Sequence, residues 1–217
     1  MRKLHMGLAG AAGAALLSVA VVQAQNGTLA GPGTADASQV TAGTYTADAG
    51  HTLVQWKVNH FGFNDYFGIF GNISGTLVLD PNDIGSAQLD VTIPVSSVVT
   101  ASEGLTDHLL RDGADGAPAD FFGSNPADAR FVSTSVRQTS STQALINGML
   151  TLNGETKPVA VMAEFTGAGA HPFNQRETVG FKGWARIKRT DFGVNFGTQV
   201  VSDTVDLEIS AAFEKSE

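Results

Sequence analysis

The sequence predicts an all-β protein: an antiparallel up-and-down β-barrel of about eight strands, with one long connection that carries a short helix. Three observations predict this fold. From Gly43 onward apolar and polar residues alternate, which is the period of a strand with one buried face. Turn residues rather than helical crossovers separate most of these runs, so neighbouring strands should be antiparallel. The chain has no Cys, and a closed barrel removes the exposed strand edges that a disulfide-free protein must otherwise protect.

The alternation gives eight or nine strands, and the clearest runs cover residues 54–60, 73–79, 87–93, 129–138, 143–152, 157–165, 179–189 and 199–213. Asn153-Gly154 predicts a type I′ hairpin turn, because both residues tolerate positive φ. Asp80-Pro81-Asn82-Asp83 predicts another turn. A β-sandwich is the other common arrangement of such strands. A barrel of this size is either filled by side chains or holds one small ligand.

The one long break in the strand pattern runs from Val95 to Asn125. Within it, the stretch from Ser102 to Leu110 predicts a short helix, and the rest reads as loop. An outer-membrane barrel is disfavoured, because the loops are irregular and the aromatic girdles of that class are not evident.

Residues 1–24 predict a signal peptide. Arg2 and Lys3 precede an uncharged apolar stretch, and Val22-Gln23-Ala24 fits the small-x-small cleavage pattern before Gln25. Cleavage there gives a periplasmic or secreted protein without a stable membrane span, and an uncleaved N-terminal anchor is the alternative. Residues 25–42 are rich in Gly, Ala, Ser and Thr and predict a flexible linker. The folded domain is expected over residues 43–217.

Composition excludes several classes of function. The chain has 13 basic and 21 acidic residues, a net charge of −8, which argues against a nucleic-acid partner. It has no Gly-x-Ser-x-Gly elbow, no His-Glu-x-x-His pair and no His spacing typical of a metal site. The sequence therefore predicts no enzymatic activity, metal or cofactor. A hydrolase that uses an unrecognised pocket is the weaker alternative.

Phenylalanines gather in three clusters next to glycines or at expected strand ends. The first cluster is Phe61, Phe63, Phe67 and Phe70 with Tyr66; the second is Phe121-Phe122; the third is Phe192 and Phe196. Rings at the ends of strands can line the mouth of an apolar cavity. They can equally form a plug that closes the barrel, and the sequence leaves both interpretations open.

A set of motifs, in this order, resembles the YceI-like family of polyisoprenoid-binding proteins over about residues 43–213. The motifs are His51-Thr52-x-Val54-x-Trp56-x-Val58-x-His60-x-Gly62, Gly68-x-Phe70, Ile93-Pro94-Val95-Ser96-Ser97, Asp107-His108-Leu109, Asp120-Phe121-Phe122, Gly148 to Val159, Ile187-x-Arg189-Thr190-Asp191-Phe192-Gly193 and Val201-x-Asp203-x-Val205. The resemblance implies a lipocalin-like barrel whose apolar tunnel holds a polyprenyl chain or the tail of an isoprenoid quinone. Relatives are often periplasmic, and a homodimer is possible. The chain departs from the family pattern between Leu110 and Asp120 and at Asn125-Pro126.

The residues expected to contact such a ligand are Trp56, Val58, His60, Phe63, Phe70, Leu89, His108, Phe121, Phe122, Phe165, Trp184 and Phe192. His60 and His108 can donate hydrogen bonds to a head group, although histidines at strand ends more often satisfy backbone groups. Arg189 is expected to pair with Asp191 at a turn. The leading hypothesis is a carrier or sequestering protein for an isoprenoid. The alternative is a β-barrel adaptor that binds a protein partner and has a fully packed interior.

Overall fold

The computed structural model describes residues 31–216, so the predicted signal peptide and the first part of the predicted linker lie outside the described residues. Within this range most of the chain forms strands: β1 (Gly43–Ala47), β2 (Leu53–His60), β3 (Asn64–Phe70), β4 (Ser74–Leu79), β5 (Gln88–Ile93), β6 (Val99–Thr100), β7 (Ala129–Gln138), β8 (Gln143–Leu152), β9 (Glu155–Ala170), β10 (Glu177–Lys188) and β11 (Thr204–Lys215). One α-helix, α1 (Glu103–Leu110), lies in the connection between β6 and β7. Short 3-10 helices are η1 (Ala37–Gln39), η2 (Ile84–Ser86), η3 (Val95–Ser97), η4 (Ala114–Gly116) and η5 (Arg189–Phe192).

The strands form a closed antiparallel barrel, as predicted. Eight of them make the ring, in the order β1-β4-β5-β7-β8-β9-β10-β11, and β1 pairs again with β11 to close it. One edge of the long strand β11 pairs with two strands in succession: residues 206–210 pair with β2, and residues 213–215 pair with β1. Strands β2, β3 and β6 therefore continue the wall at one end of the barrel.

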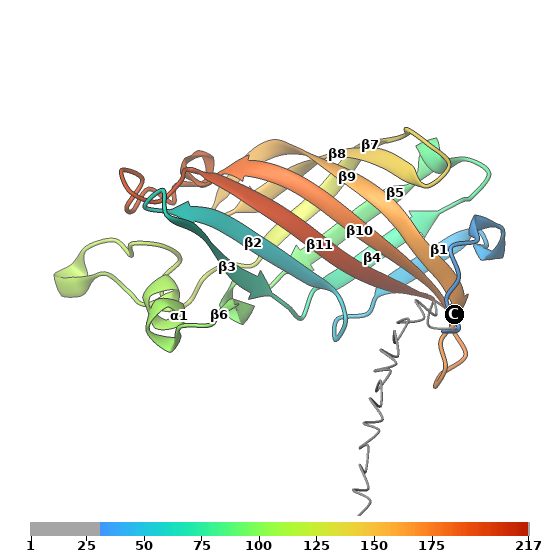
Figure 1. Ribbon diagram of the computed structural model, residues 1–217, viewed down its shortest axis with the longest axis horizontal. Coiled ribbons are helices and arrows are strands. Elements are labelled where there is room, and N and C mark those ends of the chain that lie inside the picture. The colour runs from blue at the N-terminus through green and yellow to red at the C-terminus, as the bar shows by residue number, and fades with distance from the viewer. Residues whose placement is uncertain (1–30, 217) are drawn as a thin grey trace, which may run out of the picture. The chain divides into compact units, whose positions relative to one another are not determined.

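The two ends of the barrel differ in their connections (Figure 1). Helix α1 and β6 lie beside β3 at one end, called here the α1 end, and β1 lies at the other, called the β1 end. The helix begins as predicted, since the Ser102 side chain accepts a hydrogen bond from the Leu105 amide as an N-cap. Asn153 and Gly154 have φ of 52° and 83°, which the predicted type I′ turn requires.

The β1 end is closed by side chains. The buried Tyr45 ring packs with Leu79, Val179 and Phe213, and its hydroxyl lies 2.6 Å from Glu177 Oε1. Burial, together with the nearby Glu177 carboxylate, raises the pKa of Tyr45 to about 12.

A hydrogen-bonded carboxylate completes this closure. Burial alone would raise the pKa of Glu177, but hydrogen bonds from Thr41 and Tyr45 and the charge of Lys215 hold that pKa below its usual value. Lys215 Nζ lies 3.6 Å from Glu177 Oε2. The Thr41 amide and hydroxyl both donate to the same carboxylate, at 2.7 and 2.6 Å. The two ends of the folded chain are thus joined at one point, since Thr41 precedes β1 and Lys215 ends β11.

Two parts of the predicted strand map are corrected. Residues 64–70, taken as an aromatic connection, form strand β3 and pair along their whole length with β2. Residues 199–203 precede β11 rather than belonging to it. The packed part of the chain also begins before Gly43: Thr34 exchanges two backbone hydrogen bonds with Ala168, and Val40 is buried.

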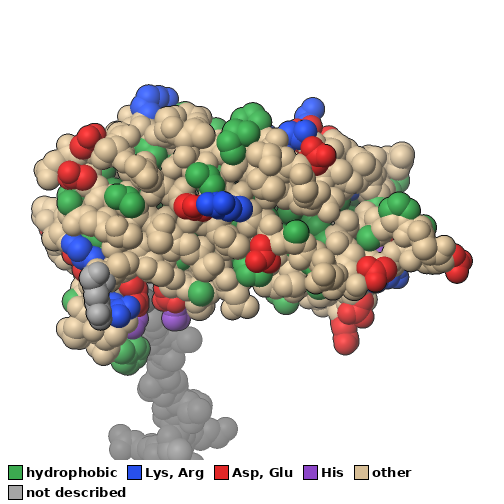
Figure 2. Space-filling view, turned by 180° about the vertical axis from the view of Figure 1, so that it is seen from behind, with side chains coloured by type: hydrophobic (Ala, Val, Ile, Leu, Met, Phe, Trp, Pro, Cys, Tyr) green, Lys and Arg blue, Asp and Glu red, His purple; other side chains and the backbone are tan. Residues whose placement is uncertain are grey.

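The outer face of the barrel carries ion pairs between neighbouring strands, together with some exposed apolar side chains. On β11 the side chain of Asp206 points outward between its cross-strand neighbours, with Arg186 Nε 2.6 Å and Lys57 Nζ 3.6 Å from its carboxylate. The hydrogen bond from Arg186 is the main cause of the lowered pKa of Asp206. Charged side chains lie scattered over the face that Figure 2 shows.

Candidate functional site

A large apolar cavity occupies the interior of the barrel. Its volume is about 530 Å³, and aliphatic and aromatic side chains make up nearly all of its lining. The alternation of each strand builds it: on β11, Val205, Leu207, Ile209 and Ala211 face the cavity, while the residues between them face outward. The interior is therefore hollow, which argues against the adaptor hypothesis with a fully packed barrel.

Strands β2 and β5 both contribute to the cavity wall. Val54, Trp56 and Val58 line the cavity from β2, and Leu89 and Val91 line it from β5. These are the strands whose alternation is clearest in the sequence. The cavity thus comes from regular strand geometry, with no special loop needed to create it.

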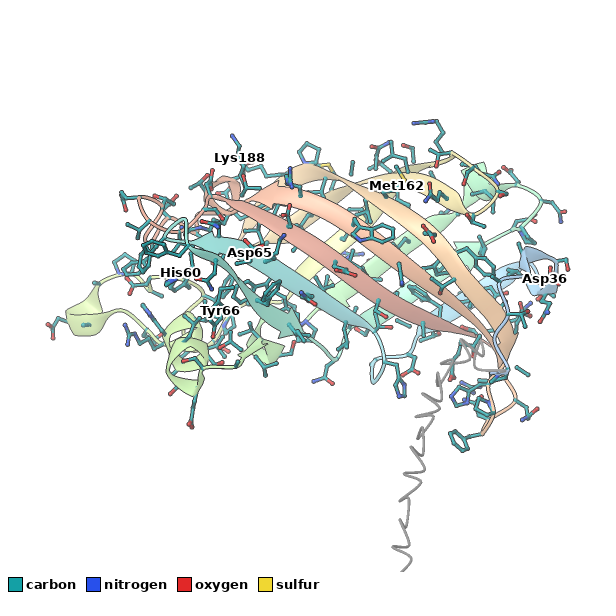
Figure 3. The ribbon with its side chains drawn as sticks, viewed as in Figure 1. Asp36, His60, Asp65, Tyr66, Met162 and Lys188 are labelled. Atoms are coloured by element: carbon teal, nitrogen blue, oxygen red, sulfur yellow. The ribbon has the colours of Figure 1, made fainter. Side chains whose placement is uncertain are left out.

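An aromatic cluster, which we call the mouth cluster, narrows the cavity at the α1 end. It consists of His108 on α1 with Phe121 and Phe196, whose three ring centroids lie 5.2 to 5.4 Å apart with their edges toward one another. His108 Nε2 lies 2.6 Å from Asp120 Oδ2. His60 lies at the same end (Figure 3). Phe121 and Phe196, from two of the three phenylalanine clusters in the sequence, thus lie together at this end of the cavity.

Arg189 holds the loop that carries Phe196 of the mouth cluster. Its guanidinium is buried and donates hydrogen bonds to four backbone carbonyls, those of Val194, Phe196, Val201 and Ser202. Burial lowers the pKa of Arg189, and the nearby Asp203 carboxylate opposes that shift. The expected pair with Asp191 is wrong: the side chain instead organises the loop between η5 and β11. An arginine has enough donors to satisfy four carbonyls at once, which explains its use here.

A second, smaller cavity of about 180 Å³ lies toward the β1 end. The two cavities share a boundary, here called the partition, formed by Leu89, Ile146, Ala163, Phe181 and Phe213. The Phe181 ring belongs to the partition, and its centroid lies 6.0 Å from that of Phe165 and 6.3 Å from that of Phe213, in edge-to-face geometry. The hollow interior is thus divided into two compartments.

Eight of the twelve predicted ligand-contacting residues line the main cavity. They are Trp56, Val58, His60, Phe70, Leu89, His108, Phe121 and Phe122. The structure brings them together from β2, β3, β5, α1 and the connection that follows α1.

The other four predicted residues lie elsewhere. Phe63 is 88% exposed in the turn after β2, and Trp184 is 38% exposed on the outer face of β10. Phe165 lines the second cavity only. Phe192 does not line the cavity; it is buried in a core cluster with Val95, Ala129, Phe131 and Leu150, which do.

Several cavity residues were missed by choosing large aromatic side chains rather than following alternation. They include Val91, Phe131, Ile146, Phe181, Ile187 and Ile209. The signal was present on β10, where Phe181 and Ile187 share one parity and Lys182, Arg186 and Lys188 share the other with Trp184. That parity alone places Trp184 outside.

No helix within residues 31–216 is long and apolar enough to cross a membrane. Over the same described range, no three His, Asp or Glu side chains come together in a group that could hold a metal ion.

The comparison with known proteins identifies the family. A family model described as YceI-like domain matches residues 45–213, which is most of the chain. The chain belongs to the YceI-like family. A UPF0312 protein of Pseudomonas putida is 34% identical over 177 residues, covering 80% of this chain and 88% of the relative. A UPF0312 protein of Pseudomonas fluorescens is 36% identical over 182 residues, with the same coverage of both chains.

Solved structures of this YceI-like fold are also similar. The Campylobacter jejuni YceI protein is 27% identical, with a TM-score of 0.62 over 73% of this chain and 90% of that one. A polyisoprenoid-binding domain from Saccharophagus degradans, implicated in plant cell wall breakdown, has a TM-score of 0.54 at 15% identity, covering 79% of this chain and 98% of its own. At that identity the second likeness concerns the fold alone.

Proposed function

We propose that this protein binds an amphiphilic isoprenoid, of the polyprenyl or isoprenoid-quinone type, inside the barrel and sequesters or carries it in the periplasm. The observation that carries the proposal is the continuous apolar lining of a cavity of about 530 Å³. The YceI-like family and the polyisoprenoid-binding domain of the same fold support the choice of ligand class.

The volume suits a tail of moderate length. At the packing density of protein interiors an isoprene unit needs about 120 Å³. The main cavity therefore accommodates about four units. Burying about 20 carbons nominally contributes about 16 kcal/mol, at about 0.8 kcal/mol per methylene. The entropy lost in ordering the tail and in association offsets much of this gain, so the net binding free energy is much smaller than 16 kcal/mol.

The cavity extends along the barrel strands, and this shape favours an elongated, narrow ligand. The cavity runs along β11 from Val205 to Phe213, eight residues and so about 26 Å of strand. A flexible, linear chain of isoprene units suits such a space.

The test is to find the ligand that the protein carries. The full chain is expressed with its signal, purified without detergent, extracted with organic solvent and analysed by mass spectrometry. We expect a near-stoichiometric isoprenoid lipid or quinone. Protein that is lipid-free and that also fails to take up added polyprenols and isoprenoid quinones would contradict the proposal.

A matched pair of variants ties the ligand to the cavity. Ala185 on β10 faces the cavity, and Ala160 on β9 is exposed on the outer face. Ala185→Trp should place an indole in the space of the tail and abolish co-purification of the lipid. Ala160→Trp adds the same side chain outside and should leave the lipid content unchanged. Equal lipid content in both variants would place the ligand somewhere other than the cavity.

The periplasmic location has its own test. The intact mass of the exported protein should correspond to a chain that begins at Gln25, and the protein should appear in the fraction released from the periplasm. A mass that includes residues 1–24 would indicate an uncleaved anchor instead.

A further inference from the structure

Exposed apolar side chains gather at the α1 end of the barrel, around the mouth of the main cavity. They lie on two loops, which we call the rim loops: the turn of residues 61–63 between β2 and β3, and the loop of residues 193–203 between η5 and β11 (Figure 1). The exposed apolar side chains of the rim loops are Phe61, Phe63, Phe196 and Val200. We propose that the rim loops dock on the surface of a lipid bilayer and insert these side chains into it, so that the mouth of the cavity faces the membrane. The inference rests on the proposed function for its purpose, which is to exchange an apolar ligand with the bilayer.

The rim loops are continuous with the lining of the cavity. Among the large apolar side chains that are exposed within residues 31–216, three also line the main cavity. They are Phe61, Phe196 and Val200, each about half exposed. The cavity therefore comes nearest to solvent at the rim loops. A bilayer placed there gives an apolar ligand a path into the cavity that avoids water, whereas a folded protein seated on the same loops would cover the mouth.

Hydrogen bonds and ring contacts hold the rim loops in position. The Phe61 amide donates to the Val200 carbonyl at 2.8 Å, which places the two loops side by side. The Arg189 guanidinium holds the second loop through its carbonyl oxygens, and the Phe196 ring packs against the Phe121 ring. The loops thus present their exposed side chains from a fixed framework. Burial of these side chains against an apolar partner gains the free energy of removing them from water.

The charge distribution favours a bilayer with a neutral surface. Residues 61–63 and 193–202 contain no Asp, Glu, Lys or Arg. Residues 103–120, which form α1 and the connection after it, contain five acidic residues and one arginine. Proteins that bind anionic lipids through charge carry clusters of Lys and Arg instead. We therefore expect docking by insertion of apolar side chains, with no requirement for anionic lipid and no weakening by salt.

Two exposed phenylalanines at opposite ends of the barrel give a matched test. Phe63 in the first rim loop is 88% exposed, and Phe173 in the turn between β9 and β10 is 91% exposed. The wild type, Phe63→Ser and Phe173→Ser, each expressed as the full chain, are mixed with vesicles of phosphatidylcholine and phosphatidylethanolamine and separated by flotation. We expect Phe63→Ser to bind the vesicles about tenfold more weakly than the wild type, as the loss of one inserted ring implies. Phe173→Ser should bind like the wild type, and equal melting temperatures would show that all three proteins are folded.

A fluorescent label reports which end of the barrel meets the membrane, because the chain has no Cys and a single one can be introduced. Asn64→Cys lies next to Phe63, and Asn174→Cys lies next to Phe173, both at exposed positions. Each variant carries the same environment-sensitive fluorophore. On addition of vesicles the emission of the label at residue 64 should shift to the blue, and that of the label at residue 174 should not.

Equal vesicle binding by the wild type and Phe63→Ser, equal losses in both serine variants, or equal shifts of the two labels would overturn the inference. A dimer that dissociates in Phe63→Ser, in a protein that does not bind vesicles, would overturn it as well, because the rim loops would then be an interface between two copies of the chain. The lipid content of the purified protein tests the proposed function separately. Protein that carries an isoprenoid but does not bind vesicles would refute this inference and leave the proposed function standing. Protein that floats with vesicles but takes up no isoprenoid would do the reverse.

Discussion

Replacing Phe181 with Ala should join the two cavities and lengthen the isoprenoid tail that the protein prefers. Phe181 lines both cavities, and its ring packs edge-to-face against Phe165 and Phe213. Without it, the 180 Å³ of the second cavity becomes continuous with the 530 Å³ of the first. At about 120 Å³ per isoprene unit, the room for the tail grows from about four units to about six.

The size of the effect follows from the apolar area that the longer tail can bury. Two further isoprene units nominally contribute about 8 kcal/mol, at about 0.8 kcal/mol per methylene. Most of this is offset by ordering the added segment. We expect the ratio of affinities for a six-unit over a four-unit quinone to rise at least tenfold, equivalent to about 1.4 kcal/mol.

The assay compares the affinities of quinones with two, four, six and eight isoprene units for the wild type and two variants. Phe181→Ala should shift the preferred length upward. Phe165→Ala is the matched control, because it removes the same ring from the far side of the partition and enlarges only the second cavity. Each substitution costs stability, about 3–5 kcal/mol for a fully buried Phe and less here, where the rings are only partly buried. Binding is therefore measured below both melting temperatures. An unchanged length preference in Phe181→Ala, or an equal change in the control, would refute the reasoning.

Two further predictions concern the ends of the barrel. The folded-state pKa of Tyr45, about 12, lies above its ordinary value of about 10. The stability that this group contributes is therefore complete below pH 10 and is lost as the pH rises toward 12. By linkage the loss amounts to about 2–3 kcal/mol in urea unfolding. Tyr45→Phe should abolish that loss, and an identical alkaline transition in both proteins would contradict the assignment. Arg189→Met leaves four carbonyl oxygens without their donor and should destabilise the protein by about 2–4 kcal/mol; a thermal unfolding curve unchanged within error would show that the loop is held by other contacts.

Strand alternation predicted the barrel and most of one cavity wall, because both depend on which face of a strand a side chain occupies. Along β2 the alternating Val54, Trp56 and Val58 all face the cavity, as expected. The closure of the ring was also accessible from the sequence, as the pattern of many antiparallel strands without disulfides. What alternation does not contain is the distance between opposite walls, so the presence of an empty space rather than a packed core had to come from the structure.

Strand β3 escaped prediction because its two faces do not differ in polarity. Tyr66 and Phe70 point inward, but Phe67 and Ile69 on the outer face are also apolar, and Gly68 interrupts the run. The glycine was interpreted as part of a connection. Its physical role is to leave room for the Trp56 ring across the strand pair, a tertiary requirement that leaves no periodic signal in the sequence.

Trp184 and Arg189 were misplaced for a different reason: each was assigned by its chemical type rather than by its position. A large aromatic ring was assumed to belong inside, although its parity on β10 places it outside. Arg189 was assumed to form an ion pair with Asp191, whereas its buried guanidinium donates its hydrogen bonds to backbone carbonyls. The residues next to Arg189 in the sequence do not reveal that the loop of residues 194–202 folds back and brings its carbonyl oxygens to the guanidinium.

The two ends of the barrel are held by interactions of different strength, and we expect this difference to decide at which end the proposed ligand enters. At the β1 end, the closed strand ladder is reinforced by the hydrogen-bonded Tyr45–Glu177 pair, and opening it would break backbone pairing between β1 and β11. At the α1 end, the mouth cluster is held by ring contacts worth about 0.5–1.5 kcal/mol each and by the His108–Asp120 hydrogen bond. Local opening selects the segment with the smallest loss of pairing. We therefore expect the tail of the proposed ligand to pass the mouth cluster and to extend along β11 toward the partition, where its last carbons meet Phe181.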